Sequence, residues 1–520
     1  MAFQRITIKD LPDEENASVN VMLEQIESKT RRNLLRRSYY ESKHAVRQVA
    51  AILPPAYGTL ATTVGWTAKA VDMLVRRCNV DTFTWTGGDL ADLGFRELWS
   101  ENSLGSEIGQ GSTASLIHAS AFVSTTAGEA GEPDVGIHFF DALDATGIWN
   151  ARTRRLSAGL VIDTRNKDGV VTGLTLHLPS AVVTCEKSGP KWSMTDRAEH
   201  DYGMTLDLLP YRPRTGRAFG ASRISRPMMA IQDMAIRELL RLEGHMDVYS
   251  FPEMWMLGAD LSVFGDNVDP FQVMLGRIKG IPDDDDAVNP RVDVKQFEAS
   301  SPEPHLAALN AHAKLFARES GLPDSSLAIT QMANPTSAES YDASQYDLVA
   351  EAEGAQDDWT PALSRVAARA LAMKAKDPSL VATLEPTMRP KWRSAKFVSR
   401  AAEADAGMKQ LQSMPWLAET EVGLDLIGLT DEQIRRAQAE RRRTQGNVTL
   451  ANIADGAVPT VTDDAQATKD NIEALGMAIR FGADPEVAAE FLGLKGLKFT
   501  GAVPVTLRQP QSDAAQLEDQ

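Results

Sequence analysis

The residues with the clearest potential for chemistry are four consecutive aspartates, Asp283–Asp286, which follow Pro282. Clustered carboxylates are the ligands that Mg²⁺ and Ca²⁺ prefer. A cation site, however, needs oxygens that converge from a turned backbone, usually with a glycine in the turn and a glutamate further along the chain. Four adjacent aspartates offer neither feature, so the pattern favours a solvated acidic loop over a metal site.

Other catalytic and cofactor-binding patterns are missing from the sequence. Gly109-Gln110-Gly111 is the nearest approach to a phosphate-binding loop, but no Gly-Lys-Ser/Thr sequence occurs anywhere. No two histidines stand four residues apart, as a helical zinc site needs. The two cysteines, Cys78 and Cys185, suit small buried apolar side chains in a reducing compartment. The sequence therefore predicts no metal, no cofactor and no catalytic residue, that is, a protein that is not an enzyme.

A cluster of arginines is the strongest basic feature. Arg31, Arg32, Arg36 and Arg37 crowd the middle of a helix predicted over residues 17–53. The favoured interpretation is a solvated face whose aliphatic stems lie on apolar neighbours. The alternative is contact with an acidic neighbour or with DNA. The formal net charge of −17 argues against a tight DNA binder, because such proteins usually present a basic surface.

Two amphipathic helices flank the acidic run. The first lies within Gly220–Ser250 and the second over residues 304–320, where Gly321-Leu322-Pro323 ends it. Residues at steps of three or four predict the packed face of each helix. In the first helix these are Met228, Ile231, Ala235, Leu239, Leu242 and Met246, and in the second Leu306, Leu309, Ala313 and Phe316.

A polar loop and a long helix follow the second amphipathic helix. Thr336 and Glu339 form a capping box that opens the long helix, and Thr360-Pro361 should kink or break it. A second capping box, Thr430 to Gln433, opens an arginine-rich helix. Residues 381–393 are expected to be extended.

Alternating apolar and polar residues predict a β unit over about residues 119–209. Asn166-Lys167-Asp168-Gly169 is a strong hairpin signal between two of its strands. No apolar run reaches the roughly 18 residues of a membrane span, so no membrane partner is expected.

The order of these elements resembles the portal proteins of tailed bacteriophages, in particular the siphophage type found in phages of actinobacteria. The similarity is carried by SRISRPMMAIQDMAIRELLRLE, FPEMWMLG, SGLPDSSL and NPTSAESYDASQYDLVAEAE, and it extends over nearly the whole chain. It implies an α+β, mainly α, portal fold with wing, stem, clip and crown-like regions. The implied division is an acidic disordered lead (1–16), a wing containing the β unit (17–222), a stem helix (223–248), a clip (249–303), a second stem helix (304–320), a tunnel loop (321–336), a long kinked wing helix (337–376), wing and crown helices (377–446), a linker (447–468), a C-terminal helical motif (469–508) and a disordered tail (509–520).

The resemblance also implies a function. Copies of the chain, twelve in the family, would form a ring at one capsid vertex of the virion, through which double-stranded DNA passes without sequence readout. Expected partners are the terminase large subunit, a head-completion or adaptor protein, and the major capsid and scaffolding proteins, with synthesis in the host cytoplasm. Like charge along such a conduit would keep the polyanion from adhering. The tunnel-loop residues placed near DNA are Ser325, Ser326, Thr330, Gln331 and Asn334.

Two other functions stay open from the residues alone. One is a scaffolding or capsid-interaction protein that never forms a pore, and the other, less favoured, is a metal-dependent enzyme that processes DNA.

Overall fold

The structure is a computed structural model that describes residues 5–44, 63–88, 90–128, 131–249, 254–257, 278–281, 293–296, 300–327, 343–396 and 400–454. The chain divides into two compact units, residues 1–397 and 398–520, which are described separately. Both the helices and the sheets expected from the sequence are present, so the α+β class is confirmed.

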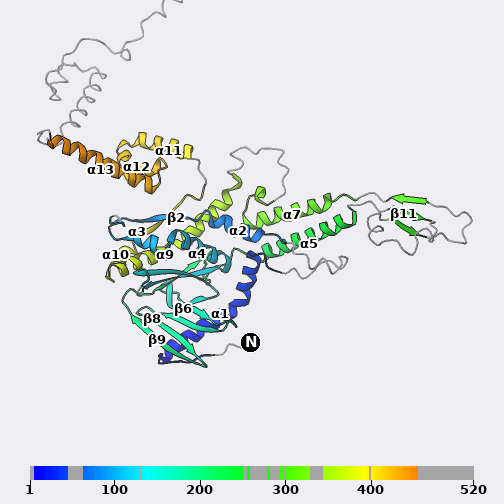
Figure 1. Cartoon of the computed structure of the whole chain (residues 1–520), viewed down its shortest axis with the longest axis horizontal. Coiled ribbons are helices and arrows are strands. Elements are labelled where there is room, and N and C mark those ends of the chain that lie inside the picture. The colour runs from blue at the N-terminus through cyan, green and yellow to red at the C-terminus, as the bar shows by residue number, and fades with distance from the viewer. Residues whose placement is uncertain are drawn as a thin grey trace, which may run out of the picture. The chain divides into compact units, whose positions relative to one another are not determined.

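The first unit has a helical layer built around α9 (Tyr346–Lys374). The helices α2 (Trp66–Val75), α3 (Phe95–Glu101), α4 (Leu104–His118) and α10 (Leu380–Leu384) contribute to the same region (Figure 1). A two-stranded sheet joins β2 (Val80–Trp85) to β14 (Met388–Trp392). The prediction of an extended chain over 381–393 is therefore right only for its second half, because α10 occupies the first.

Thr360-Pro361 was predicted to kink or break this helix, but α9 runs without a break through Pro361. Proline removes a backbone donor and costs about 3 kcal/mol in a helix interior. The surrounding residues Trp359, Ala362 and Leu363 are fully buried, and this burial outweighs the cost.

Cys78 lies against α9, where its Sγ is 3.7 Å from the carbonyl oxygen of Ala352, and burial raises the pKa of its thiol to about 12. Cys185 is also buried and unpaired, as expected.

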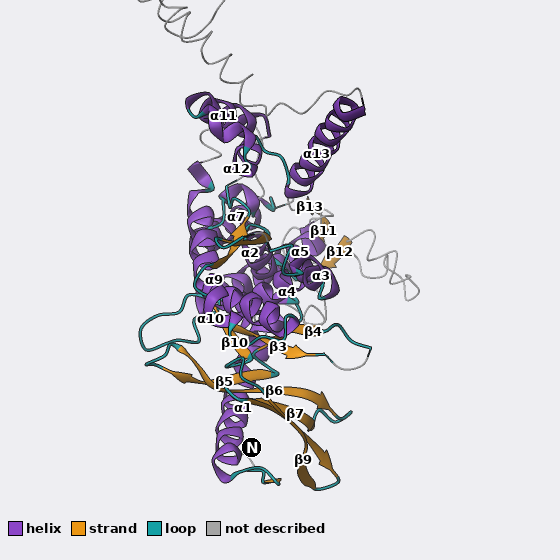
Figure 2. Cartoon of the chain, turned by 90° about the vertical axis from the view of Figure 1, so that its left-hand side faces the viewer, coloured by secondary structure: helices purple, strands orange, loops and turns teal. Residues whose placement is uncertain are grey.

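The predicted β unit is present and consists of two sheets (Figures 1 and 2). The smaller has the order β10-β3-β4 and the larger the order β1-β9-β8-β7-β6-β5. The β6–β7 hairpin turns at Asn166–Gly169, where Gly169 has a positive φ, as the sequence predicted. The strands are β1 (Ile8–Lys9), β3 (Ser120–Ala127), β4 (Val135–Asp141), β5 (Ala145–Asn150), β6 (Arg155–Arg165), β7 (Val171–His177), β8 (Ala181–Ser188), β9 (Lys191–Glu199) and β10 (Leu206–Pro210).

The long helix α1 (Asp13–Tyr40) covers one face of the larger sheet. Its Val19, Met22 and Ile26 are buried against strands β6 to β8. The predicted disordered lead is wrong for residues 5–16, because Ile8 pairs with Trp192 as the parallel strand β1 and is buried. The amide of Asn16 fixes this segment, accepting from the backbone of Ile8 and donating back to it. Residues 45–53 of the predicted first helix lie outside the described residues.

Between the two amphipathic helices the chain forms a small sheet of order β12-β11-β13. Its strands are β11 (Met254–Leu257), β12 (Ile278–Ile281) and β13 (Asp293–Gln296). Strand β11 contains Trp255, Met256 and Leu257, and β13 pairs antiparallel with it. The Asp283–Asp286 run lies outside the described residues.

The second unit, where described, consists of α11 (Arg400–Ser413), η4 (Pro415–Glu419), α12 (Glu421–Leu426) and α13 (Asp431–Ala454). The second capping box is confirmed, since the side chain of Gln433 accepts from the Thr430 amide and Thr430 Oγ1 accepts from the Gln433 amide. The predicted linker (447–468) begins too early, because α13 continues through Ala454. The predicted C-terminal motif and tail lie outside the described residues.

Candidate functional site

The two amphipathic helices, α5 (Arg226–Tyr249) and α7 (Glu303–Ser320), pack side by side as a helical hairpin (Figure 1). Helix α7 contributes Leu309, Ala313 and Phe316, as the sequence predicted, whereas Leu306 remains 38% exposed. Gly321, in the left-handed conformation, ends α7 at the predicted position. The hairpin therefore has an apolar seam that is already covered within a single chain.

The buried face of α5 differs from the predicted one. Met228 and Ala235 are buried, Ile231, Leu239 and Leu242 are half-buried, and Met246 is 45% exposed. The buried row instead steps by four, from Met228 through Gln232, Ile236 and Leu240 to Gly244. Apolar periodicity missed this row because it includes a glutamine and a glycine. Gln232 is tolerated there because its Oε1 accepts from the backbone amide of Thr67, in the first turn of α2.

Polar side chains link the two helices toward the far end of the hairpin. His305 Nδ1 of α7 lies 2.7 Å from Glu238 Oε1 of α5, and Arg241 donates to the other carboxylate oxygen at 2.9 Å. Burial alone would raise the pKa of Glu238, but the bonds from His305 and Arg241 outweigh it and hold that pKa below its usual value. The ring of His245 lies 5.0 Å from that of His305.

A buried arginine anchors the base of the hairpin. Arg223, only 4% exposed, precedes α5 and donates to the carbonyl oxygens of Ala70 in α2 and Ser320 at the end of α7. Its Nη1 lies 2.5 Å from Glu351 Oε1 in α9, and Tyr211 donates to the same carboxylate. Burial would raise the pKa of Glu351, but the Arg223 charge reverses this and lowers it. One side chain thus fixes α2, α5, α7 and α9 relative to one another.

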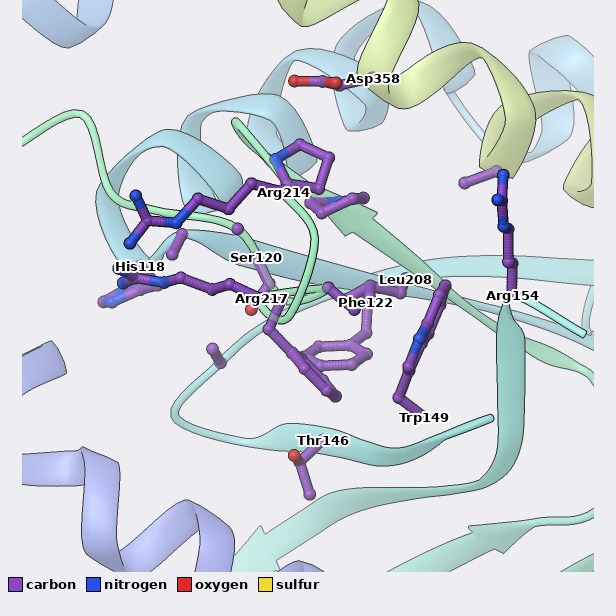
Figure 3. A pocket seen from close by; sticks show the side chains of 18 of the residues that line it. His118, Ser120, Phe122, Thr146, Trp149, Arg154, Leu208, Arg214, Arg217 and Asp358 are labelled. Atoms are coloured by element: carbon purple, nitrogen blue, oxygen red, sulfur yellow. The ribbon is translucent and has the colours of Figure 1, made fainter. Parts of the chain in front are cut away.

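A cavity of about 1280 Å³, here called the basic pocket, lies beside the middle of α1 (Figure 3). Lys29 and Arg32 of α1 line one part of it, and Arg214 and Arg217, from the turn after β10, line another. Figure 3 shows the guanidinium groups of Arg214 and Arg217 on the same side of the pocket as the His118 ring. Arg36 lies close to this group: burial, together with the charges of Arg32 and Arg217, lowers its pKa to about 10.

The arginines of the predicted cluster lie in two different environments. Arg32 faces the basic pocket, whereas Arg37 pairs with Glu41 at 2.9 Å on the helix surface, as a solvated face would. Sequence reasoning missed Arg214 and Arg217 because nothing local connects their turn to α1.

Comparison with known proteins now decides the family. A family model described as "Phage portal protein, SPP1 Gp6-like" matches residues 21–447, which is most of the chain and includes the hairpin, its anchor and the basic pocket.

The chain belongs to the SPP1 Gp6-like family of phage portal proteins.

Two curated relatives are described as portal proteins. The portal protein of Mycobacterium phage L5 is 23% identical over 388 residues, covering 72% of this chain and 77% of the relative. The portal protein of Mycobacterium phage D29 is 24% identical over 390 residues, with the same coverage. The predicted resemblance to siphophage portal proteins is thereby confirmed, and the chain functions as a phage portal protein.

Solved structures from "Neck of native GTA particle computed with C12 symmetry" and "Neck of empty GTA particle computed with C6 symmetry" were also matched. The native-particle structure is 14% identical, covers 71% of this chain and 91% of its own, and gives a TM-score of 0.33. The empty-particle structure is 13% identical, covers 69% of this chain and 88% of its own, and gives a TM-score of 0.36. Scores this low do not establish a shared fold.

In this portal protein only the start of the predicted tunnel loop is described. Ser325 and Ser326 belong to a short 3₁₀ helix, η3 (Asp324–Ser326), directly after α7. Ser325 is exposed, and the carbonyl oxygen of Ser326 accepts from Lys69 of α2. Thr330, Gln331 and Asn334 lie outside the described residues, as does the capping box at Thr336.

The described part of the portal chain has no group of three His, Cys, Asp or Glu side chains placed to share a metal ion. Gly109-Gln110-Gly111 lies inside helix α4, so its backbone amides are not arranged as a phosphate-binding loop. None of the helices among these residues has the length and apolarity required to cross a bilayer.

Proposed function

We propose that copies of this chain close into a ring, twelve as expected from the family, at one vertex of the capsid in the virion. Double-stranded DNA would pass through the ring during genome packaging and ejection. Helices α5 and α7 would be the stem that forms the channel wall, the β11–β13 region the clip, and the loop after α7 the tunnel loop, with Ser325, Ser326, Thr330, Gln331 and Asn334 nearest the DNA.

The observation that carries the proposal is the apolar surface that the hairpin leaves uncovered. Met246 of α5 is 45% exposed, and Leu306 and Leu315 of α7 are 38% and 49% exposed. Leu306 and Leu315 stand nine residues apart on α7, so they lie on opposite sides of the helix. In a ring, each copy presents two different faces to its neighbours. The exposed sides of one hairpin would then be covered by the hairpins on either side.

The role is structural. The portal ring would dock the terminase large subunit, whose ATPase moves the DNA, and later a head-completion or adaptor protein. During head assembly it would contact the major capsid and scaffolding proteins. The ring itself would hydrolyse no nucleotide, which agrees with the absence of a Gly-Lys-Ser/Thr nucleotide-binding sequence from the chain. Its synthesis would take place in the host cytoplasm.

Electron microscopy of the purified chain tests the proposal. We expect closed rings with a central hole. Particles that stay compact and monomeric at micromolar concentration would refute it. Metal-dependent cleavage of DNA by such monomers would support the enzyme alternative, and binding to capsid protein without a pore would support the scaffolding alternative.

A further inference from the structure

The basic pocket concentrates positive charge in a protein that is acidic overall. Lys29, Arg32 and Arg36 stand three and four residues apart, so they share one face of α1. Arg214 and Arg217 reach the same region from the turn after β10. Within the described part of the chain, none of these five side chains forms an ion pair. Burial, and to a smaller extent the neighbouring positive charges, lower the pKa values of Lys29, Arg32 and Arg36.

Buried polar atoms without partners surround the cluster. Asn33 is 1% exposed; its Nδ2 donates to the carbonyl oxygen of Ala142, but its Oδ1 has no partner. His118 is 4% exposed, and its Nδ1 likewise has none. Both residues line the pocket. Arg36 Nη1 is buried and unpartnered as well. Of these atoms, Arg36 Nη1 is a donor suited to a carboxylate, whereas Asn33 Oδ1 is an acceptor and needs a donor instead.

We propose that the basic pocket is a docking site for carboxylates of a second copy of this chain, supplied by the acidic surface of helix α3. This inference rests on the ring proposed above and assigns one contact between neighbouring copies. Guanidinium groups suit this role because their planar donors match the geometry of a carboxylate.

Charge and shape favour a second copy over DNA. With a formal net charge of −17, another copy is itself a rich source of surface carboxylates. Asp357 and Asp358 also line the pocket and repel any anion, so an occupant with one or two carboxylates meets less repulsion than the continuous charge of a DNA backbone. The pocket is concave and partly open, so side chains of a neighbour can reach into it, whereas a DNA duplex is a broad convex rod.

Helix α3 offers the complementary surface. Glu97 and Glu101 stand four residues apart, so they share one exposed face. Glu97 reaches Lys374 at only 3.7 Å, and its side chain stays 60% exposed. Figure 2 shows α3 among the helices of the first unit, whereas β5 and β10, which contribute residues to the pocket, belong to the sheets below them. Contacts between unlike faces of successive copies are the kind that a ring requires.

A charge-swap experiment tests the inference. R32E/R217E should raise the protein concentration at half-assembly roughly tenfold or more, since each acidic side chain would now face carboxylates. E97R/E101R should do the same. Because every copy in a ring supplies both faces, the combined variant R32E/R217E/E97R/E101R should recover most of the assembly. Sedimentation velocity and electron microscopy would measure it, with circular dichroism to verify folding.

The control K167E/K191E makes the same charge change at exposed positions near the tips of two β hairpins, and it should assemble normally. If the wild type forms rings and R32E/R217E assembles equally well, the proposed contact between the basic pocket and α3 is refuted, but the proposed ring is not. If each double variant weakens assembly and the combined variant does not recover it, α3 does not occupy the pocket and the proposal is refuted. Normal assembly of R32E/R217E with weakened binding of a duplex DNA probe would assign the pocket to nucleic acid instead. A wild-type chain that never forms rings would refute the proposed function itself.

Discussion

Arg223 Nη1 lies 2.5 Å from Glu351 Oε1, and this buried ion pair ties the start of α5 to α9. Removing one partner of such a pair leaves an uncompensated buried charge. We expect Arg223→Met to lower the free energy of unfolding by about 3 to 5 kcal/mol. Chemical denaturation of the purified chain would measure the change.

The control for this variant is Arg318→Met, because Arg318 is an exposed arginine on α7 that has no described ion pair. It should change stability by less than about 0.5 kcal/mol. Glu351→Gln should fall between the two, since the amide keeps hydrogen bonds to Arg223 and Tyr211 but not the charge. If Arg223→Met were as mild as the control, the base of the hairpin would not depend on this contact.

Buried His177 should make stability depend on pH. Burial, with smaller effects from the charges of Arg369 and His200, lowers its pKa from 6.5 to about 3. The unfolded chain therefore binds a proton near pH 6.5 while the folded chain stays neutral. The stabilisation is complete above pH 6.5 and is lost progressively as the pH falls toward 3. Between pH 7 and pH 5 we expect this histidine to account for a loss of about 2 kcal/mol.

His177→Gln offers the comparison, because glutamine cannot titrate but can keep a bond to Thr205 Oγ1, which now lies 2.8 Å from His177 Nδ1. Urea denaturation at pH 7 and pH 5 should show a smaller difference for this variant than for the wild type. An equal difference would place the titration elsewhere.

Two substitutions in the hairpin should distinguish contacts within one chain from contacts between chains. Leu240 is 3% exposed in the α5–α7 seam, so Leu240→Ala should cost about 2 to 4 kcal/mol of folding stability. Leu315 is 49% exposed, so Leu315→Asp should leave the stability of the isolated chain almost unchanged but weaken ring assembly. Denaturation at low concentration and electron microscopy at high concentration would separate the effects. Rings of L315D as abundant as those of the wild type would exclude this side of α7 from the interface.

Local signals in the sequence predicted local structure well. The capping box at Thr430 and Gln433 and the Asn166–Gly169 hairpin turn need only neighbouring residues, and both are present. The packed face of α7 was predicted largely correctly because its buried positions are apolar. On α5 the same rule failed at Gln232, whose hydrogen bond to Thr67 comes from a distant helix.

Features that depend on distant contacts could not be predicted. The ordered start of the chain depends on Ile8 finding strand β9, and the continuity of α9 through Pro361 depends on the burial of Trp359. The basic pocket brings Arg217 next to α1 only after folding. For the site as a whole, the sequence indicated the family and the two helices of the hairpin, but not Arg223 as its anchor.

The predicted tunnel loop can be tested at Gln331 and Asn334. Their short polar side chains suit weak contact with phosphates and no base readout. Bulky apolar replacements, Gln331→Leu with Asn334→Leu, should reduce DNA packaging or retention severalfold while leaving ring formation intact, because they would narrow a passage without altering the α5–α7 seam. Packaged DNA per particle and ring yield would be measured together. The matched control, Lys167→Leu with Lys191→Leu, adds two leucines near exposed hairpin tips and should affect neither quantity. Unchanged packaging by the loop variant would count against placing these residues beside the DNA.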